Sequence, residues 1–134
     1  MNSTTHIGKA GEFRVLSELI LRGHDPALKV VDNGIDIILE NGKTIQVKTV
    51  TKPLFDSKKS GRVYVVTLSS ARYKKGKQSP QKNNLKTDFM IAWLIQNDVF
   101  YIIPCKEIKG GKSVSLGYGI SKYEKFRNNW EVVK

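Results

Sequence analysis

The fold of this chain is decided by two adjacent stretches, Gly34-Ile35-Asp36-Ile37-Ile38-Leu39 and Thr44-Ile45-Gln46-Val47-Lys48-Thr49-Val50. Both are rich in β-branched apolar residues, which predicts strands over 35–39 and 44–50. Polar side chains interrupt these apolar runs at Asp36, Gln46 and Lys48. Aspartate is a poor strand residue, so we expect these interruptions to serve chemistry rather than sheet formation.

The connection between the two strands decides which polar side chains share a face, because side chains alternate along a strand. A two-residue turn would put Asp36 and Lys48 on opposite faces. A three-residue loop, Glu40-Asn41-Gly42, places Asp36 opposite Gln46 with Lys48 on the same face, and Gly42 suits the left-handed position that ends such a loop. We expect this loop, or a bulge of equal effect, since it alone gathers the polar side chains.

Upstream, the segment 9–21 predicts an amphipathic helix that stops near Gly23. On a helical wheel, Glu12 lies in the middle of an apolar arc formed by Phe13, Val15, Leu16, Leu19 and Ile20. A carboxylate aimed at a core needs a partner, because isolated burial costs several kcal/mol. The alternative is that Glu12 lies near the surface in the first helical turn, where the helix dipole stabilises it.

The remaining apolar runs complete one domain, 1–134, with the order αβββ–loop–ββα. Further strands are expected at 28–31, 62–68, 88–95 and 99–103. A last helix is expected over 121–129, with Ser121 as its N-cap. This order indicates a mixed sheet with helices packed against it.

Positive charge is concentrated in the middle of the chain, whose formal net charge is +11. The stretch 57–87 contains no acidic residue, and its basic residues are Lys58, Lys59, Arg62, Arg72, Lys74, Lys75, Lys77, Lys82 and Lys86. Such a stretch predicts salt-sensitive binding to a polyanion, with DNA as the expected partner, and a merely solubilising loop is the alternative. The polar part, about 69–87, is expected to be a mobile basic loop.

Several classes of protein are excluded by what the sequence lacks. One cysteine, Cys105, allows neither a disulfide framework nor a multi-cysteine zinc site. No run approaches the roughly 20 apolar residues that span a bilayer, and the first nine residues contain no apolar signal segment. A phosphate-binding Gly-x-x-x-x-Gly-Lys-Ser/Thr motif does not occur, so no nucleotide cofactor is expected. We expect a cytoplasmic protein without a membrane partner.

Three motifs together resemble the PD-(D/E)XK nuclease superfamily: Gly8-Lys9-Ala10-Gly11-Glu12, Gly34-Ile35-Asp36 and Gln46-Val47-Lys48. They are most similar to small archaeal-type Holliday junction resolvases and to restriction-like and homing endonucleases that carry Gln-x-Lys. The resemblance implies an α/β (α+β) fold with a restriction-endonuclease-like αβββαβ core, in which helices flank a mixed central sheet.

The resemblance also implies a catalytic site formed by Glu12, Asp36, Gln46 and Lys48. Asp36, Glu12 and Gln46 would bind Mg²⁺, with Mn²⁺ as a substitute, because Mg²⁺ prefers hard oxygen ligands. Lys48 would orient the attacking water and steady negative charge on the phosphorane.

Gln46 stands where most members of the superfamily carry a carboxylate, which removes one negative charge from the expected metal site. Weaker metal affinity, or a higher Mg²⁺ requirement, is the expected consequence. Another carboxylate could compensate for it, and the candidates are Asp32, Glu40 and Asp88.

The expected function is that of a Mg²⁺-dependent DNA endonuclease, which hydrolyses phosphodiester bonds with a metal-activated water. Branched DNA such as a Holliday junction and site-specific duplex DNA are both candidate substrates. One site cuts one strand, so cutting both strands predicts a homodimer. The alternative is a nucleic-acid-binding module of the same fold whose catalysis has weakened.

Overall fold

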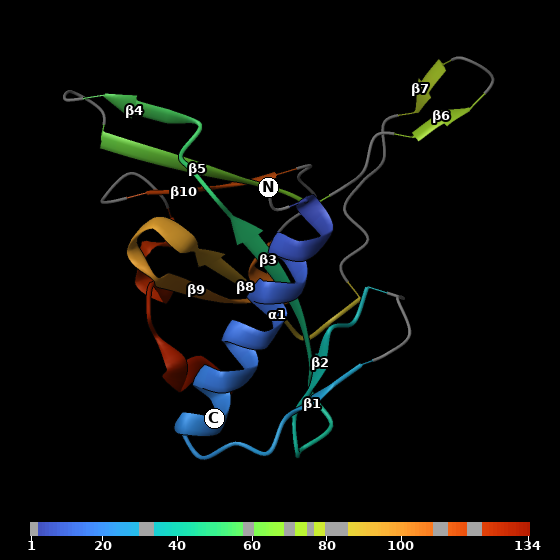
Figure 1. Cartoon of the computed structure of the whole chain (residues 1–134), viewed down its shortest axis with the longest axis vertical. Coiled ribbons are helices and arrows are strands. Elements are labelled where there is room, and N and C mark those ends of the chain that lie inside the picture. The colour runs from blue at the N-terminus through green and yellow to red at the C-terminus, as the bar shows by residue number, and fades with distance from the viewer. Residues whose placement is uncertain are drawn as a thin grey trace.

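The fold is built from one long helix and two β-sheets, with a small β-ribbon that stands apart from them (Figure 1). The computed structural model describes residues 3–29, 34–57, 61–68, 72–74, 77–79, 86–108, 113–117 and 122–134. Within these ranges, no helix is long and apolar enough to cross a membrane.

The central sheet has five strands in the order β1-β2-β3-β8-β9. The strands are β1 (Ala27–Leu28), β2 (Ile37–Ile38), β3 (Thr44–Val50), β8 (Phe89–Leu94) and β9 (Val99–Pro104). Strands β3 and β8 pair in parallel, whereas the other neighbours are antiparallel, so the sheet is mixed. Strand β3 is the central strand of this sheet, and its two neighbours are β2 and β8.

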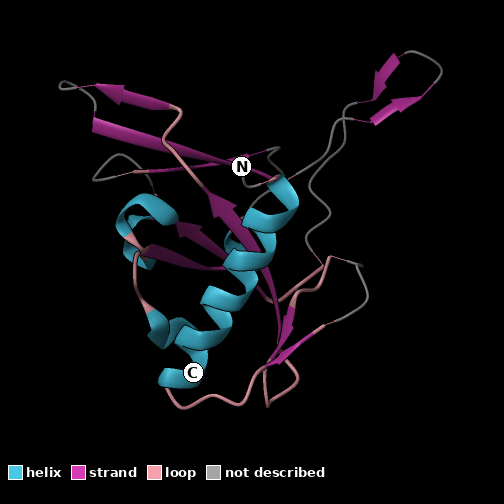
Figure 2. Ribbon diagram, viewed as in Figure 1, coloured by secondary structure: helices cyan, strands magenta, loops and turns pink. Residues whose placement is uncertain are grey.

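Helix α1 (Thr4–Leu21) covers one face of this sheet (Figure 2). Its buried stripe is Gly11, Val15 and Leu19, which recur every four residues and pack with the sheet in one apolar core. Phe13 and Ile20 are each 54% exposed. The apolar arc is therefore centred on Gly11 and Val15, and the expected centre at Glu12 is wrong.

A three-stranded antiparallel sheet contributes to the core on the other face of the central sheet. Its strands are β4 (Phe55–Ser57), β5 (Gly61–Thr67) and β10 (Ser113–Leu116), in the order β10-β5-β4. Tyr64 and Val66 of β5 pack with Met90, Ala92 and Leu94 of β8 in this second core. Alternation along β8 thus sends its side chains into both cores.

The expected fold class is confirmed, with a mixed sheet at its centre and the strand over 44–50 at its predicted bounds. The helix expected over 121–129 is wrong, because the described part of that segment holds the 3₁₀ turn η3 (Glu124–Phe126), followed by η4 (Trp130–Val133). Asn128 has a left-handed backbone with φ 51°, which ends helical geometry. Two further 3₁₀ turns, η1 (Ile95–Asn97) and η2 (Cys105–Glu107), flank β9.

The basic segment 69–87 was expected to be a loop, but its described parts include two strands. Strands β6 (Arg72–Lys74) and β7 (Lys77–Ser79) form an antiparallel ribbon in which Lys74 is paired with Lys77. Figure 1 shows this ribbon apart from both larger sheets. Part of the predicted DNA-binding segment is therefore a β-ribbon.

Candidate active site

The turn between β2 and β3 has the predicted three-residue geometry. The N–H of Leu39 donates to the carbonyl of Lys43 at 2.8 Å, and the N–H of Gly42 donates to the carbonyl of Leu39 at 2.9 Å. Gly42 is left-handed, with φ 85°. The resulting register pairs Ile37 with Ile45 and Ile38 with Thr44. These two pairs have the register that the three-residue loop predicts. The regular ladder does not continue to Asp36 opposite Gln46, because the N–H of Asp36 donates to the carbonyl of Ile45.

Asp36 lies just before β2, at the point where the regular pairing of β2 with β3 ends. Its N–H donates to the carbonyl of Ile45 at 2.9 Å, and its Oδ2 accepts a hydrogen bond from the N–H of Val47 at 2.7 Å. In a regular ladder, a main-chain carbonyl would accept that bond. The Asp36 carboxylate is thus fixed beside the stretch of β3 in which Gln46 and Lys48 flank Val47.

The two faces of β3 have different neighbours. Ile45 and Val47 belong to the core beneath α1, and Thr49 lies directly under Gly11, where a Cβ would overlap the Thr49 hydroxyl. Gln46 and Lys48 alternate onto the other face. Their parallel neighbours on β8 are Met90 and Ala92, which belong to the second core.

Glu12 lies in the third turn of α1, because the helix begins at Thr4 with Ser3 as its N-cap. The first-turn alternative therefore does not apply. The Glu12 side chain is only 16% exposed, and its Oε1 lies 3.5 Å from the Nζ of Lys9. Arg14 lies on the opposite flank of the buried stripe, where it bonds Asp98 beside β9. The flank that carries Glu12 consequently faces the β1–β2 side of the sheet.

The structure thus brings three of the four predicted site residues to one stretch of the sheet. Asp36 is bonded to the backbone between Gln46 and Lys48. Glu12 lies on the α1 side of β3, whereas Gln46 and Lys48 lie on its other face. Among the residues that the structure describes, no group of three or more His, Cys, Asp or Glu side chains is placed to hold a metal ion.

Two of the carboxylates considered as substitutes for the missing charge have other partners. Glu40 accepts hydrogen bonds from the N–H of Asp25 at 2.8 Å and from His24 Nδ1 at 3.0 Å. The Asp25 N–H, followed by His24, holds the pKa of Glu40 below its usual value. Asp88 Oδ2 accepts a bond from the N–H of Thr44 at 2.9 Å. Both lie near the first residue of β3, and Asp32 is outside the described residues.

A groove begins at Lys48 and runs along the end of β3 toward β5. It has a volume of about 410 Å³. Its lining residues are Lys48, Thr49, Val50, Thr51, Lys52, Val65, Val66 and Thr67. Sequence reasoning missed the contribution of Lys52 and Thr67. The run Lys48-Thr49-Val50-Thr51-Lys52, which mixes cations with hydroxyls at a strand end, is a signal that could have indicated it.

The predicted DNA-binding residues are spread over three places in the fold. Arg62 lies on β5 and Lys86 lies just before β8, and both are exposed. Arg72, Lys74 and Lys77 belong to the β6–β7 ribbon. The others are outside the described residues: Lys58, Lys59, Lys75 and Lys82.

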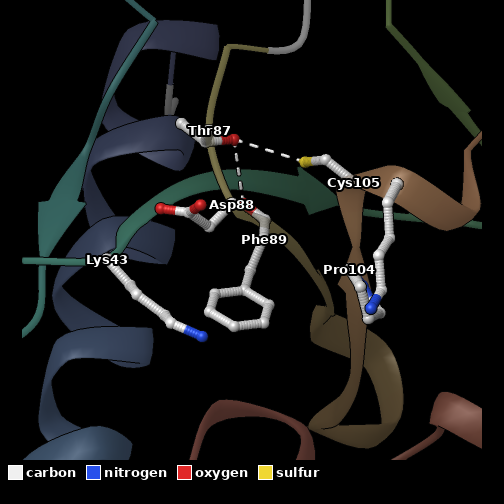
Figure 3. Close-up of a pocket in the computed structure, with 7 residues that line it drawn as sticks. Lys43, Thr87, Asp88, Phe89, Pro104 and Cys105 are labelled. Atoms are coloured by element: carbon white, nitrogen blue, oxygen red, sulfur yellow. Dashed lines mark hydrogen bonds between the residues drawn. The ribbon is translucent and has the colours of Figure 1, made fainter. Parts of the chain in front are cut away.

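A second pocket lies at the opposite end of β3 (Figure 3). It contains Thr87, Asp88 and Cys105, between Lys43 and Lys106. Thr87 Oγ1 donates to the carbonyl of Phe89 at 3.0 Å and lies 3.4 Å from the Sγ of Cys105. Burial raises the pKa of the Cys105 thiol, which disfavours the reactive thiolate. Cys105 is therefore best described as a half-buried thiol that bonds Thr87.

Comparisons with known proteins identify the fold. No protein-family model matches the chain, and no curated protein matches it. Among solved structures, the chain is similar to a bacterial homing endonuclease, I-Ssp6803I, with a TM-score of 0.77 and 22% sequence identity. The match covers 98% of this chain and 93% of that chain. The chain therefore shares its fold over nearly its whole length.

Proposed function

We propose that this protein is a metal-dependent DNA endonuclease of the PD-(D/E)XK type. The observation that carries the proposal is the bond from the N–H of Val47 to Asp36, which fixes a carboxylate beside Gln46 and Lys48. The fold shared with a homing endonuclease supports the same class, as does the net charge of +11. DNA is the expected partner, because a cationic protein gains affinity by neutralising phosphates.

The donor atoms in this region suit Mg²⁺, which prefers carboxylate and amide oxygens. Asp36 offers a carboxylate whose position is fixed by the bond from the N–H of Val47. Gln46 would add its amide oxygen, and the Glu12 carboxylate, from the α1 side of β3, would complete the set through a bound water. When bound, Mg²⁺ would polarise the phosphate and lower the pKa of a coordinated water. With only two carboxylates in the set, we expect a high Mg²⁺ requirement.

The remaining roles belong to side chains of the chain itself. Lys48 would place its ammonium group against the phosphate oxygen that gains charge, and would orient the attacking water. The bond that Asp36 accepts from β3 keeps its carboxylate in one position, which lowers the cost of assembling the site. We further propose a homodimer, because one site cuts one strand, with branched DNA or site-specific duplex DNA as substrate.

The test is a cleavage assay on branched, plasmid and linear DNA with Mg²⁺ and with Mn²⁺. Asp36→Asn keeps an oxygen that can accept the bond from Val47 but removes the charge, so we expect cleavage to fall about 100-fold or more while the fold persists. Lys48→Met should have an effect of similar size. Asp88→Asn is the matched control, because its carboxylate bonds Thr44 instead, and it should cleave normally.

Cleavage that survives Asp36→Asn or Lys48→Met would refute the assignment of the site. A catalytically weakened binding module is the second candidate, and the neutral Gln46 favours it. Tight, salt-dependent DNA binding without hydrolysis under every metal and substrate would select that candidate instead.

A further inference from the structure

We infer that the groove lined by Lys48, Lys52 and strand β5 binds the sugar–phosphate backbone of duplex DNA next to the phosphate that is cut. This inference rests on the proposed function, since it places Lys48 at the scissile phosphate. It adds that Lys52 and Thr67 are DNA-binding residues and that the groove contacts the substrate without reading its bases.

The groove lies where the chain passes from the central sheet to the smaller sheet. Strand β3 ends at Val50, and the N–H of Leu54 donates to the carbonyl of Val63 at 2.8 Å, which ties the crossing segment to β5. Residues 48–52 form one wall and residues 65–67 form the other. The crossing is therefore held at both of its ends, so the groove walls are defined by backbone pairing.

The spacing of the two lysines suits a single DNA strand. Lys48 and Lys52 are four residues apart, so their Cα atoms are separated by at most about 14 Å. One strand of B-DNA carries a phosphate about every 3.4 Å along the axis. The two ammonium groups can therefore contact phosphates a few nucleotides apart on the same strand, with Lys48 nearer to Asp36.

The chemistry of the lining residues indicates backbone contacts rather than base contacts. Two lysines can pair with phosphates, and the exposed hydroxyls of Thr51 and Thr67 can donate to phosphate oxygens. The half-buried Val50 and Val65 offer apolar surface to deoxyribose. Among the residues that the structure describes, the groove lining includes no aromatic ring on which an unpaired base could stack. The lining residues within the described part of the chain also include no acidic side chain that would repel phosphate. The groove therefore favours a strand whose bases are already paired, in duplex DNA.

The experiment measures the affinity of the full-length protein for duplex DNA over a range of salt concentrations, with a chelator present to prevent cleavage. Lys52→Gln should weaken binding several-fold at low salt and reduce the slope of log affinity against log salt by about one. Thr67→Val should weaken binding by a smaller factor and leave the slope unchanged, because it removes a neutral donor. The losses should be equal for duplexes of unrelated sequence.

Lys106→Gln is the matched control, because Lys106 is an exposed lysine in the pocket at the other end of β3. A slope for Lys52→Gln as steep as that for Lys106→Gln would overturn the inference. Tighter binding of single strands than of duplexes would also overturn it. Either result leaves the cleavage assay unaffected, whereas absence of cleavage by the unaltered protein would overturn the proposed function.

Discussion

The two ends of strand β3 carry polar side chains of similar kinds but use them differently. At the first residue, Thr44, the neighbouring carboxylate of Asp88 bonds both the N–H and the hydroxyl of Thr44. Further along, the carboxylate of Asp36 accepts a bond from the N–H of Val47, between Gln46 and Lys48. The groove that contains Lys48 opens from this second end.

The difference shows that strand pairing, rather than the mere presence of a carboxylate, distinguishes a candidate site from a structural cap. Asp88 lies at the start of the parallel pair β3–β8. Its carboxylate accepts a hydrogen bond from the backbone N–H of Thr44, the first residue of β3, so it satisfies a polar group at a strand end. Asp36 lies where β2 stops pairing with β3, so the backbone of β3 beyond Val47 lacks its neighbour from β2. A stretch of strand without a paired neighbour presents backbone groups that a substrate can approach.

The largest effect that would sharpen this comparison is expected from a carboxylate at position 46, on the part of β3 next to Asp36. Gln46→Glu should lower the Mg²⁺ concentration needed for half-maximal cleavage by about ten-fold, because an added charge strengthens binding of a hard cation. The measurement is a Mg²⁺ titration of the cleavage rate. Gln96→Glu adds the same charge in η1, beyond the pairing of Leu94 with Val50 at the far end of β3, and should leave the titration unchanged. Equal curves for both variants would contradict a metal site at Gln46.

A smaller effect is expected at the contact between α1 and the site end of β3. Gly11→Ala would drive a methyl group into Thr49, so we expect a loss of about 1–3 kcal/mol in the free energy of unfolding. Gly8→Ala is the matched control on the same helix, because a Cβ there meets nothing within 4 Å. It should stabilise the protein by about 0.5–1 kcal/mol through helix propensity. Urea unfolding of both variants measures the difference, and a stabilised Gly11→Ala would contradict the close packing.

The smallest effect is expected in the pH dependence of stability that Glu40 contributes, in the turn before β3. The pKa of Glu40 is lowered from 4.5 by the N–H of Asp25 and by His24. A carboxyl group with a lowered pKa stabilises the fold above the pKa of the unfolded chain, and that contribution disappears as pH falls through the folded pKa. Glu40→Gln should therefore be slightly less stable than the unaltered protein at pH 7. The two urea midpoints should converge as pH falls through the lowered pKa of Glu40, and a constant gap would contradict this linkage.

Sequence patterns were sufficient for the centre of the fold, because local chemistry decides it. Strand β3 occupies the predicted residues 44–50, and the register follows from the left-handed Gly42 in a three-residue turn. The C-terminal segment could not be predicted in this way. Its helical pattern is broken at Asn128, and Arg127 instead forms a bridge to Tyr101 of β9, which is a tertiary contact.

The candidate site was predictable in its residue types but not in its full surroundings. Alternation along β3 identified Gln46 and Lys48, and the interrupted strand identified Asp36. The groove wall from β5 was not foreseen, because it depends on how two sheets pack, and periodicity within one strand carries no information about that. The alternating sequence of β10, Ser113–Leu116, was a detectable sign of a further strand.

The three-residue turn at 40–42 also constrains how such a protein can change over evolutionary time. Because orientation along a strand inverts with every step, gain or loss of one residue there would swap inward and outward positions over all of 44–50. Indels of two residues preserve the parity, whereas a single-residue indel would displace Gln46 and Lys48 from Asp36 and would expose apolar side chains of the core. We therefore expect divergent descendants to differ at this hairpin tip by even numbers of residues.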